Sequence, residues 1–146
     1  MRADIVAALL AAPASVRISP AKVKVPAGTP RCYLGDGRSV LWASGGALRC
    51  AVDAEIAGRS VPRALARRYG AEPARFWPRW TAVEVVCKLR NVPLPVWLRQ
   101  HGLVPDPDLA VRTFRLADLV VSCGAAEAGP YTRLASRRAI SIARCR

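Results

Sequence analysis

The stretch Pro78–Asn91, PRWTAVEVVCKLRN, carries the clearest information about the core of this chain. Polar side chains recur in it at steps of three, four and three residues, which places them in one narrow stripe along a helix. They are Thr81, Glu84, Lys88 and Asn91. The apolar positions around the rest of the cylinder are Trp80, Val83, Val85, Val86, Cys87 and Leu89. This pattern predicts a largely buried central helix, in which Cys87 contributes packing rather than chemistry.

Proline and glycine delimit two shorter helices around this segment. Pro62 precedes the run RALARRY, and Gly70 follows it. Pro95 precedes VWLRQH, and Gly102 follows it. Because proline suits the first turn of a helix and glycine its end, we expect a helix between the members of each pair.

A further helix is predicted from about Pro107 to Ser122. Asp106 is a suitable N-cap, and Asp108 stands four residues before Arg112, a favourable spacing for an ion pair along a helix. The buried side of this helix would consist of Leu109, Phe114, Ala117, Val120 and Val121.

The first third of the chain predicts a short helix followed by strands. The apolar run Ile5–Ala12 indicates a helix that ends near Pro13, and it is far shorter than the roughly 20 residues that cross a bilayer. Lys22–Val25 alternates with period two, as a strand does. In the segment that follows, Gly35-Asp36-Gly37 and Gly45-Gly46 mark reversals between short strands. We therefore expect an antiparallel meander of three or four strands.

The fold class predicted from these patterns is α+β. It comprises a short N-terminal helix, a small antiparallel β-meander at about 22–53 and a mostly helical C-terminal two-thirds around one core, with the helical part at about 60–123. A chain of 146 residues with 52% apolar composition is long enough for a single domain spanning 1–146. The basic C-terminal segment 129–146 is expected to form a helical turn and a short strand.

The charge is strongly positive and unevenly distributed. Lys and Arg number 23 against 10 Asp and Glu, which gives a net charge of +13. Residues 59–99 hold nine basic and two acidic groups, and residues 129–146 hold five basic and no acidic groups. A field concentrated in this way attracts polyanions, of which nucleic acid is the commonest. An acidic partner protein, or solubility alone, is the alternative explanation.

Residues 62–80, PRALARRYGAEPARFWPRW, contain a small residue in the first predicted helix, a glycine four residues later and an apolar residue six beyond it. These are Ala66, Gly70 and Phe76. On these spacings the segment resembles the helix-turn-helix of many repressors and transposase-type DNA-binding segments, in which the small residue lets the helices cross closely and the glycine accepts a left-handed turn.

The resemblance implies that Pro73, Ala74 and Arg75 open the helix that enters the major groove, with Arg75 and Arg79 contacting guanine edges or phosphates. Pro78 would lie inside that helix. In the alternative interpretation Pro78 begins the next helix, and 74–77 is a connecting turn.

Two arginine clusters support phosphate contact without base recognition. Arg63 and Arg67 are four residues apart with Arg68 beside them, and the same spacing recurs near the C-terminus. The predicted nucleic-acid-binding residues are Arg63, Arg67, Arg68, Arg75, Arg79, Arg133, Arg137 and Arg138. Trp77 and Trp80 would stack on single-stranded bases or pack in the core, and packing is the expectation for Trp80.

The sequence offers little for catalysis. His101 is the only histidine, and the five cysteines at 32, 50, 87, 123 and 145 show no zinc-binding spacing. We therefore predict no catalytic residues, no metal and no cofactor. A disulfide between Cys32 and Cys50 is geometrically feasible across neighbouring strands, whereas free thiols in a reducing compartment are the simpler expectation.

The function predicted from the sequence is a non-catalytic, basic protein that binds DNA or RNA through phosphates. A structural subunit of a large assembly such as a phage or viral particle, with protein partners, is the alternative. A small basic ribonuclease-like toxin is the third hypothesis. We expect no membrane association, and a location in the cytoplasm, nucleoid or nucleus, or inside a virion.

Overall fold

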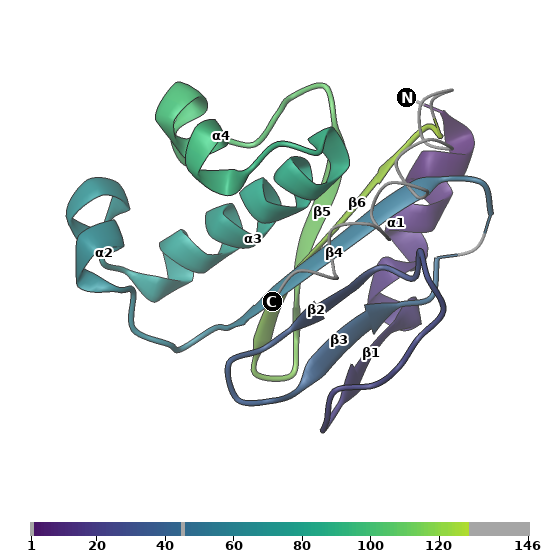
Figure 1. Cartoon of the computed structure of the whole chain (residues 1–146), viewed down its shortest axis with the longest axis horizontal. Helices are drawn as coiled ribbons and strands as arrows, with labels where there is room; N and C mark the ends of the chain where they lie inside the picture. The colour runs from purple at the N-terminus through teal and green to yellow at the C-terminus, as the bar shows by residue number, and fades with distance from the viewer. Residues whose placement is uncertain (1, 45, 129–146) are drawn as a thin grey trace, which may run out of the picture.

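Four helices and two three-stranded antiparallel sheets make up the part of the chain that the computed structural model describes, residues 2–44 and 46–128 (Figure 1). In chain order they are α1 (Ala3–Ser15), β1 (Val16–Ser19), β2 (Arg31–Tyr33), β3 (Ser39–Trp42), β4 (Arg49–Ile56), α2 (Arg63–Tyr69), α3 (Pro73–Arg90), α4 (Leu94–His101), β5 (Ala110–Leu116) and β6 (Leu119–Ala126). The prediction for the segment 129–146 lies outside the described residues.

The larger sheet, in the order β4-β6-β5, forms the middle layer of the molecule. Helix α3 packs on one face, while α1 and the smaller sheet β1-β3-β2 cover the other (Figure 1). The central strand β6 alternates between two cores: Val121 and Cys123 join the core beneath α1, and Val120 joins the core beneath α3. Its sequence LVVSCGAA is almost entirely apolar or small because both of its faces are covered.

The helix predicted from Pro107 to Ser122 is wrong, because this segment contains the hairpin of β5 and β6. The two strands join through Ala117 and Asp118, and Ala117 adopts a positive φ of 53°. β6 also pairs along its whole length with β4, from Ile56↔Leu119 to Arg49↔Ala126. Pairing with a strand far earlier in the chain overrides the local helical signals.

The predicted fold class is therefore corrected. The described chain is α+β, but a helical C-terminal two-thirds is contradicted because β5 and β6 complete the central sheet there. The predicted meander is also wrong at both ends. Lys22–Val25 belongs to no strand, and the first strand is β1, directly after α1. Strand β4 leaves the small sheet to pair with β6, so that only the β2–β3 reversal at 35–37 follows the prediction.

The predicted central helix is confirmed and is longer than expected. α3 begins at Pro73, runs through Pro78 and ends at Arg90, so residues 74–77 are helical and the connecting-turn interpretation is wrong. Val83, Val85 and Val86 on this helix are fully buried. Cys87 is buried too, and desolvation raises its pKa to about 11, in agreement with a packing role.

The helices delimited by proline and glycine are also confirmed. α2 begins directly after Pro62 and ends at Tyr69, and the following Gly70 has a φ of 100°, which is open mainly to glycine. α4 carries Pro95 in its first turn and ends at Gly102. These boundaries follow from local end chemistry alone.

Helix α1 continues through Pro13 to Ser15 instead of ending near the proline. Pro13 has no backbone N–H to donate to the Leu9 carbonyl one turn earlier. Arg112 of β5 compensates, because its Nη1 donates to the carbonyl oxygens of Leu9 at 3.0 Å and Leu10 at 2.9 Å. The Arg112 guanidinium thus joins α1 to the central sheet, and the predicted helical ion pair with Asp108 is absent from the described contacts.

Replacing Arg112 with methionine should lower the free energy of unfolding by about 1–2 kcal/mol, because two carbonyls lose a charged donor. Urea denaturation of a double-mutant cycle with Pro13→Ala measures the effect. In the Pro13→Ala background the loss should be smaller, since an alanine at this position supplies a backbone N–H to the Leu9 carbonyl. An equal loss in both backgrounds would show that Arg112 acts independently of the proline.

Candidate nucleic-acid interface

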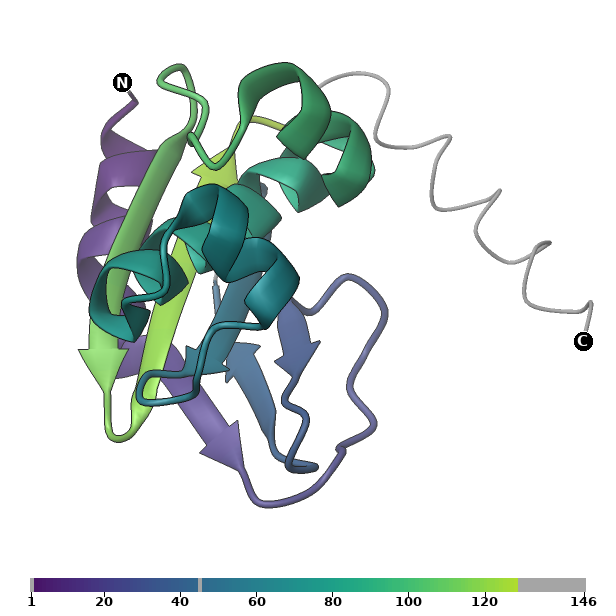
Figure 2. The same ribbon diagram turned by 90° about the vertical axis from the view of Figure 1, so that its left-hand side faces the viewer.

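Helix α2 presents three of the predicted arginines on its exposed side. Leu65 and Tyr69 pack against the core beneath α3, while Arg63, Arg67 and Arg68 are exposed. α2 stands at one edge of the helical layer, at the left of Figure 1 and at the front of Figure 2. Among residues 2–44 and 46–128, these three side chains are thus accessible to a partner. We call these three residues the α2 arginines.

The α2 arginines carry unneutralised charge. None of them forms an ion pair within the described residues, and the only contact recorded for their guanidiniums is that of Arg68 with the ring of Tyr69, 5.4 Å from its centroid. Arg63 and Arg67 lie one turn apart on the same side of the helix, as their spacing predicts.

The two predicted arginines of α3 differ from the α2 arginines because each has an intramolecular partner. Arg75 Nε lies 3.1 Å from Glu72 Oε2, although both side chains are largely exposed. Arg79 Nη2 donates to the carbonyl oxygen of Leu103 at 2.9 Å and so ties α3 to the segment after α4. The remaining predicted residues, Arg133, Arg137 and Arg138, lie outside the described residues.

The tryptophans belong to the core instead of the surface. Trp77 is 2% exposed, and its Nε1 donates to the carbonyl oxygen of Arg59 at 2.6 Å. Trp80 is half-buried and stacks on Phe76 with 5.5 Å between ring centroids. Base stacking on Trp77 is thus contradicted, and the packing role expected for Trp80 is confirmed.

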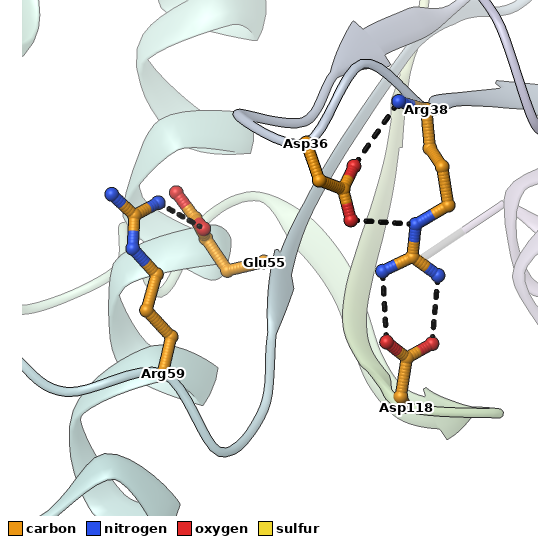
Figure 3. Close-up of polar contacts among 5 residues, drawn as sticks. All are labelled: Asp36, Arg38, Glu55, Arg59 and Asp118. Atoms are coloured by element: carbon orange, nitrogen blue, oxygen red, sulfur yellow. Dashed lines mark hydrogen bonds and ion pairs between the residues drawn. The ribbon is translucent and has the colours of Figure 1, made fainter.

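The carboxylates are largely engaged elsewhere. Among the residues that the structure describes, eight of the ten acidic residues form ion pairs with six basic ones. Figure 3 shows Arg38, which binds Asp36 through Nε at 2.8 Å and both oxygens of Asp118 through its two terminal nitrogens, each at 2.8 Å. These contacts hold the pKa values of Asp36 and Asp118 below the usual range, chiefly through the Arg38 backbone N–H for Asp36 and its guanidinium for Asp118.

Twelve basic residues are consequently left without an ion pair in the described part of the chain. They are Arg17, Lys22, Lys24, Arg31, Arg49, Arg63, Arg67, Arg68, Arg79, Arg99, Arg112 and Arg115. α2 holds three of them within seven residues.

The outer face of the small sheet is a second basic surface, which the sequence analysis missed. Arg17 of β1 and Arg31 of β2 pair with the same residue of the intervening strand. Nearby, Lys22 Nζ lies 5.6 Å from the ring centroid of Tyr33, which is 47% exposed. A signal was present, since residues 5–35 contain four basic residues and no acidic one.

A partly buried ion pair connects α3 to β4. Lys88 Nζ lies 2.7 Å from Asp53 Oδ1 and donates to the carbonyl oxygen of Val52 at 2.9 Å. Burial raises the pKa of Asp53 to about 7, with a smaller rise from the neighbouring charges of Glu84 and Glu55, although Lys88 acts in the opposite direction.

The stability of the protein should depend on Asp53 between about pH 4 and pH 7. Because the pKa of Asp53 rises from 3.8 to about 7 on folding, the folded state binds the proton more tightly, so the free energy of unfolding falls as the pH rises through this range. Asp53→Asn removes this contribution. Denaturant melts across pH should show wild type losing stability relative to the variant, whereas a constant difference would contradict the assignment.

The described residues include four free cysteines, three of them buried. They contain no group of three or more His, Cys, Asp or Glu residues that could hold a metal ion. Cys32 and Cys50 are free thiols, so the disulfide alternative is wrong. Burial raises the pKa of Cys32 and of Cys123 to about 12, which keeps both protonated and unreactive. His101 packs on Trp97 at 4.3 Å between centroids.

The segment 62–80 forms two consecutive helices, α2 and α3. Ala66 lies in the first, Gly70 follows it in a positive-φ conformation and Phe76 is buried in the second. The assignment of this pair as a DNA-reading helix-turn-helix stays a prediction.

Comparisons of the chain with protein-family models, curated proteins and solved structures find no match. None of the helices in residues 2–44 and 46–128 is both long and apolar enough to cross a membrane.

Proposed function

We propose that this protein binds nucleic acid without catalysis, and that the α2 arginines contact the phosphates. The observation that supports this most directly is three exposed guanidiniums on a peripheral helix, with no carboxylate within ion-pair distance in the described structure. Arg75 and Arg79 extend the basic surface along the start of α3, at lower strength because each already has a partner.

The geometry of α2 suits a phosphate backbone. Residues four apart on a helix are separated by about 6 Å along its axis. Duplex DNA carries one charge per about 1.7 Å of its axis, so Arg63 and Arg67 can each meet a different phosphate. Guanidinium groups bind phosphate oxygens through paired N–H donors. Such contacts fix position but read no sequence, so binding should be largely independent of sequence.

Fluorescence anisotropy with random-sequence duplex DNA, single-stranded DNA and RNA across a salt series tests this proposal. With three phosphate contacts, the logarithm of the association constant for duplex DNA should fall linearly with the logarithm of salt concentration, at a slope of about −3. Comparing the three polymers decides between DNA and RNA. Absent binding, or binding that does not change with salt, would overturn the proposal.

A structural subunit of a larger assembly is the second candidate, favoured by the outer side of α1. Val6 and Leu10 stand four residues apart there and are 38% and 66% exposed. Exposed apolar side chains that share a helix face are typical of protein contacts. Self-association on sizing, together with absent nucleic-acid binding, would favour this candidate.

A further inference from the structure

A small basic pocket lies among β2, the start of β4 and the C-terminal end of α3. Its volume is about 310 Å³. Three cationic side chains line it, each from a different part of the chain: Arg31 from β2, Arg49 from β4 and Lys88 from α3. Gly28 and Thr29, from the loop before β2, complete one wall.

The positive charge of this pocket is only partly neutralised. Arg31 and Arg49 form no ion pair within the described residues. Lys88 Nζ uses two of its three donors, on Asp53 and Val52, so one remains. The pocket therefore holds two unneutralised guanidiniums and one ammonium.

Arg49 also has an unsatisfied hydrogen-bond donor. Its Nε is buried and has no hydrogen-bond partner in the described structure. A buried donor without an acceptor destabilises a protein, and native structures rarely leave one unsatisfied. A counter-ion in the pocket would stabilise the charge of this partly buried guanidinium, which forms no ion pair within the described residues.

We propose that this pocket binds a phosphate group, held by Arg49 and Arg31 with Lys88. Arginine presents a planar pair of donors that matches two phosphate oxygens, and lysine adds a compact charge. Gly28 and Thr29 line the same pocket, and both residue types carry N–H or O–H donors. The volume suits a single phosphate or a phosphomonoester. The site shares no residue with the α2 arginines and does not depend on their function.

The proposed role requires binding alone, without a chemical step. Cys50 is its potential nucleophile, and burial raises the pKa of this thiol, so that the thiolate is scarce. The predicted outcome is a bound phosphate group that leaves unchanged.

Isothermal titration of the full chain with inorganic phosphate, at ionic strength matched with chloride, tests the proposal. We expect saturable binding that Arg49→Gln weakens by about tenfold or more, since a charged hydrogen bond is lost. Arg49→Lys keeps the charge but not the paired donors, so its phosphate affinity should lie between those of wild type and Arg49→Gln. Arg115→Gln is the matched control, because it removes one exposed and unpaired arginine outside the pocket.

The source of the phosphate is decided by repeating the titration with an oligonucleotide that has or lacks a 5′-phosphate. Binding of inorganic phosphate indicates a free anion, and a requirement for the oligonucleotide indicates a polymer phosphate. Thermal unfolding checks that Arg49→Gln folds, and Arg31→Gln serves in its place if it does not.

The proposed phosphate site would be overturned if no phosphate probe showed saturable binding. It would also be overturned if Arg49→Gln and Arg115→Gln lost phosphate affinity equally. These outcomes separate the pocket from the proposed function. If the protein binds inorganic phosphate but has no affinity for nucleic acid, only the proposed function is refuted. If it binds DNA in a salt-dependent way that Arg49→Gln and Arg31→Gln do not change, and binds no phosphate, only the pocket is refuted.

Discussion

Replacing Arg63 and Arg67 together with glutamine should weaken binding to random-sequence duplex DNA by about tenfold to a hundredfold. Each arginine that contacts a phosphate releases about one counterion, so the slope of log affinity against log salt should become shallower by about two. Both side chains are exposed on α2 and take part in no ion pair of the described structure, so the fold should be unaffected. Anisotropy over the salt series measures both quantities.

The matched control is Lys24→Gln with Arg115→Gln, which removes the same charge from exposed positions in a loop and in β5. This variant should bind with nearly wild-type affinity and slope. If the two double variants lose affinity equally, net charge and not the α2 surface governs binding, and the assignment of the interface to α2 fails.

Replacing Gly124 with alanine should lower the free energy of unfolding by about 2–3 kcal/mol. Gly124 lies in β6 directly beneath α3, where a Cβ would stand 2.4 Å from Val85 Cγ1 and 2.9 Å from Leu89 Cδ1. Both neighbours are buried, and the branched side chain of Val85 has little freedom to move aside within a helix. α3 would have to shift away from the sheet.

Chemical denaturation measures this effect, and Gly58→Ala is the control. A Cβ at Gly58 meets nothing within 4 Å, and the residue is exposed. Its stability should change by less than about 0.5 kcal/mol, as at ordinary surface positions. Similar stabilities for the two variants would contradict the close contact between α3 and β6.

Features that depend only on residues close together in the chain could be predicted from the sequence. The stripe of polar residues in Pro78–Asn91 correctly identified the buried helix, because a helix repeats its faces over a few residues. Proline and glycine correctly bounded α2 and α4. These signals require no knowledge of distant segments.

The strands depended on distant partners. Residues 107–122 carry helical end signals, yet the segment also contains the β-branched run Val120–Val121 and the alternating run of β5. The pairing of β6 with β4 decides between them, and no local window contains both strands. Conversely, Lys22–Val25 alternates like a strand but has no pairing partner, and lies in the connection from β1 to β2.

The candidate interface divides in the same way. The exposure of Arg63 and Arg67 follows from their spacing on one helix, and the pairing of Arg75 with Glu72 follows from a spacing of three. The contact of Arg79 with the Leu103 carbonyl joins α3 to the segment after α4, so local patterns could not reveal it. The pocket of Arg31, Arg49 and Lys88 likewise exists only after folding.

Nuclear magnetic resonance of the arginine Nε–H groups in the full chain, recorded while random-sequence duplex DNA is added, tests the central claim most directly. The signals of Arg63, Arg67 and Arg68 should shift together and saturate, and added salt should reverse the shift. If the signals of all three arginines stay unchanged as DNA is added, whether the DNA binds elsewhere or does not bind at all, an interface on α2 is contradicted.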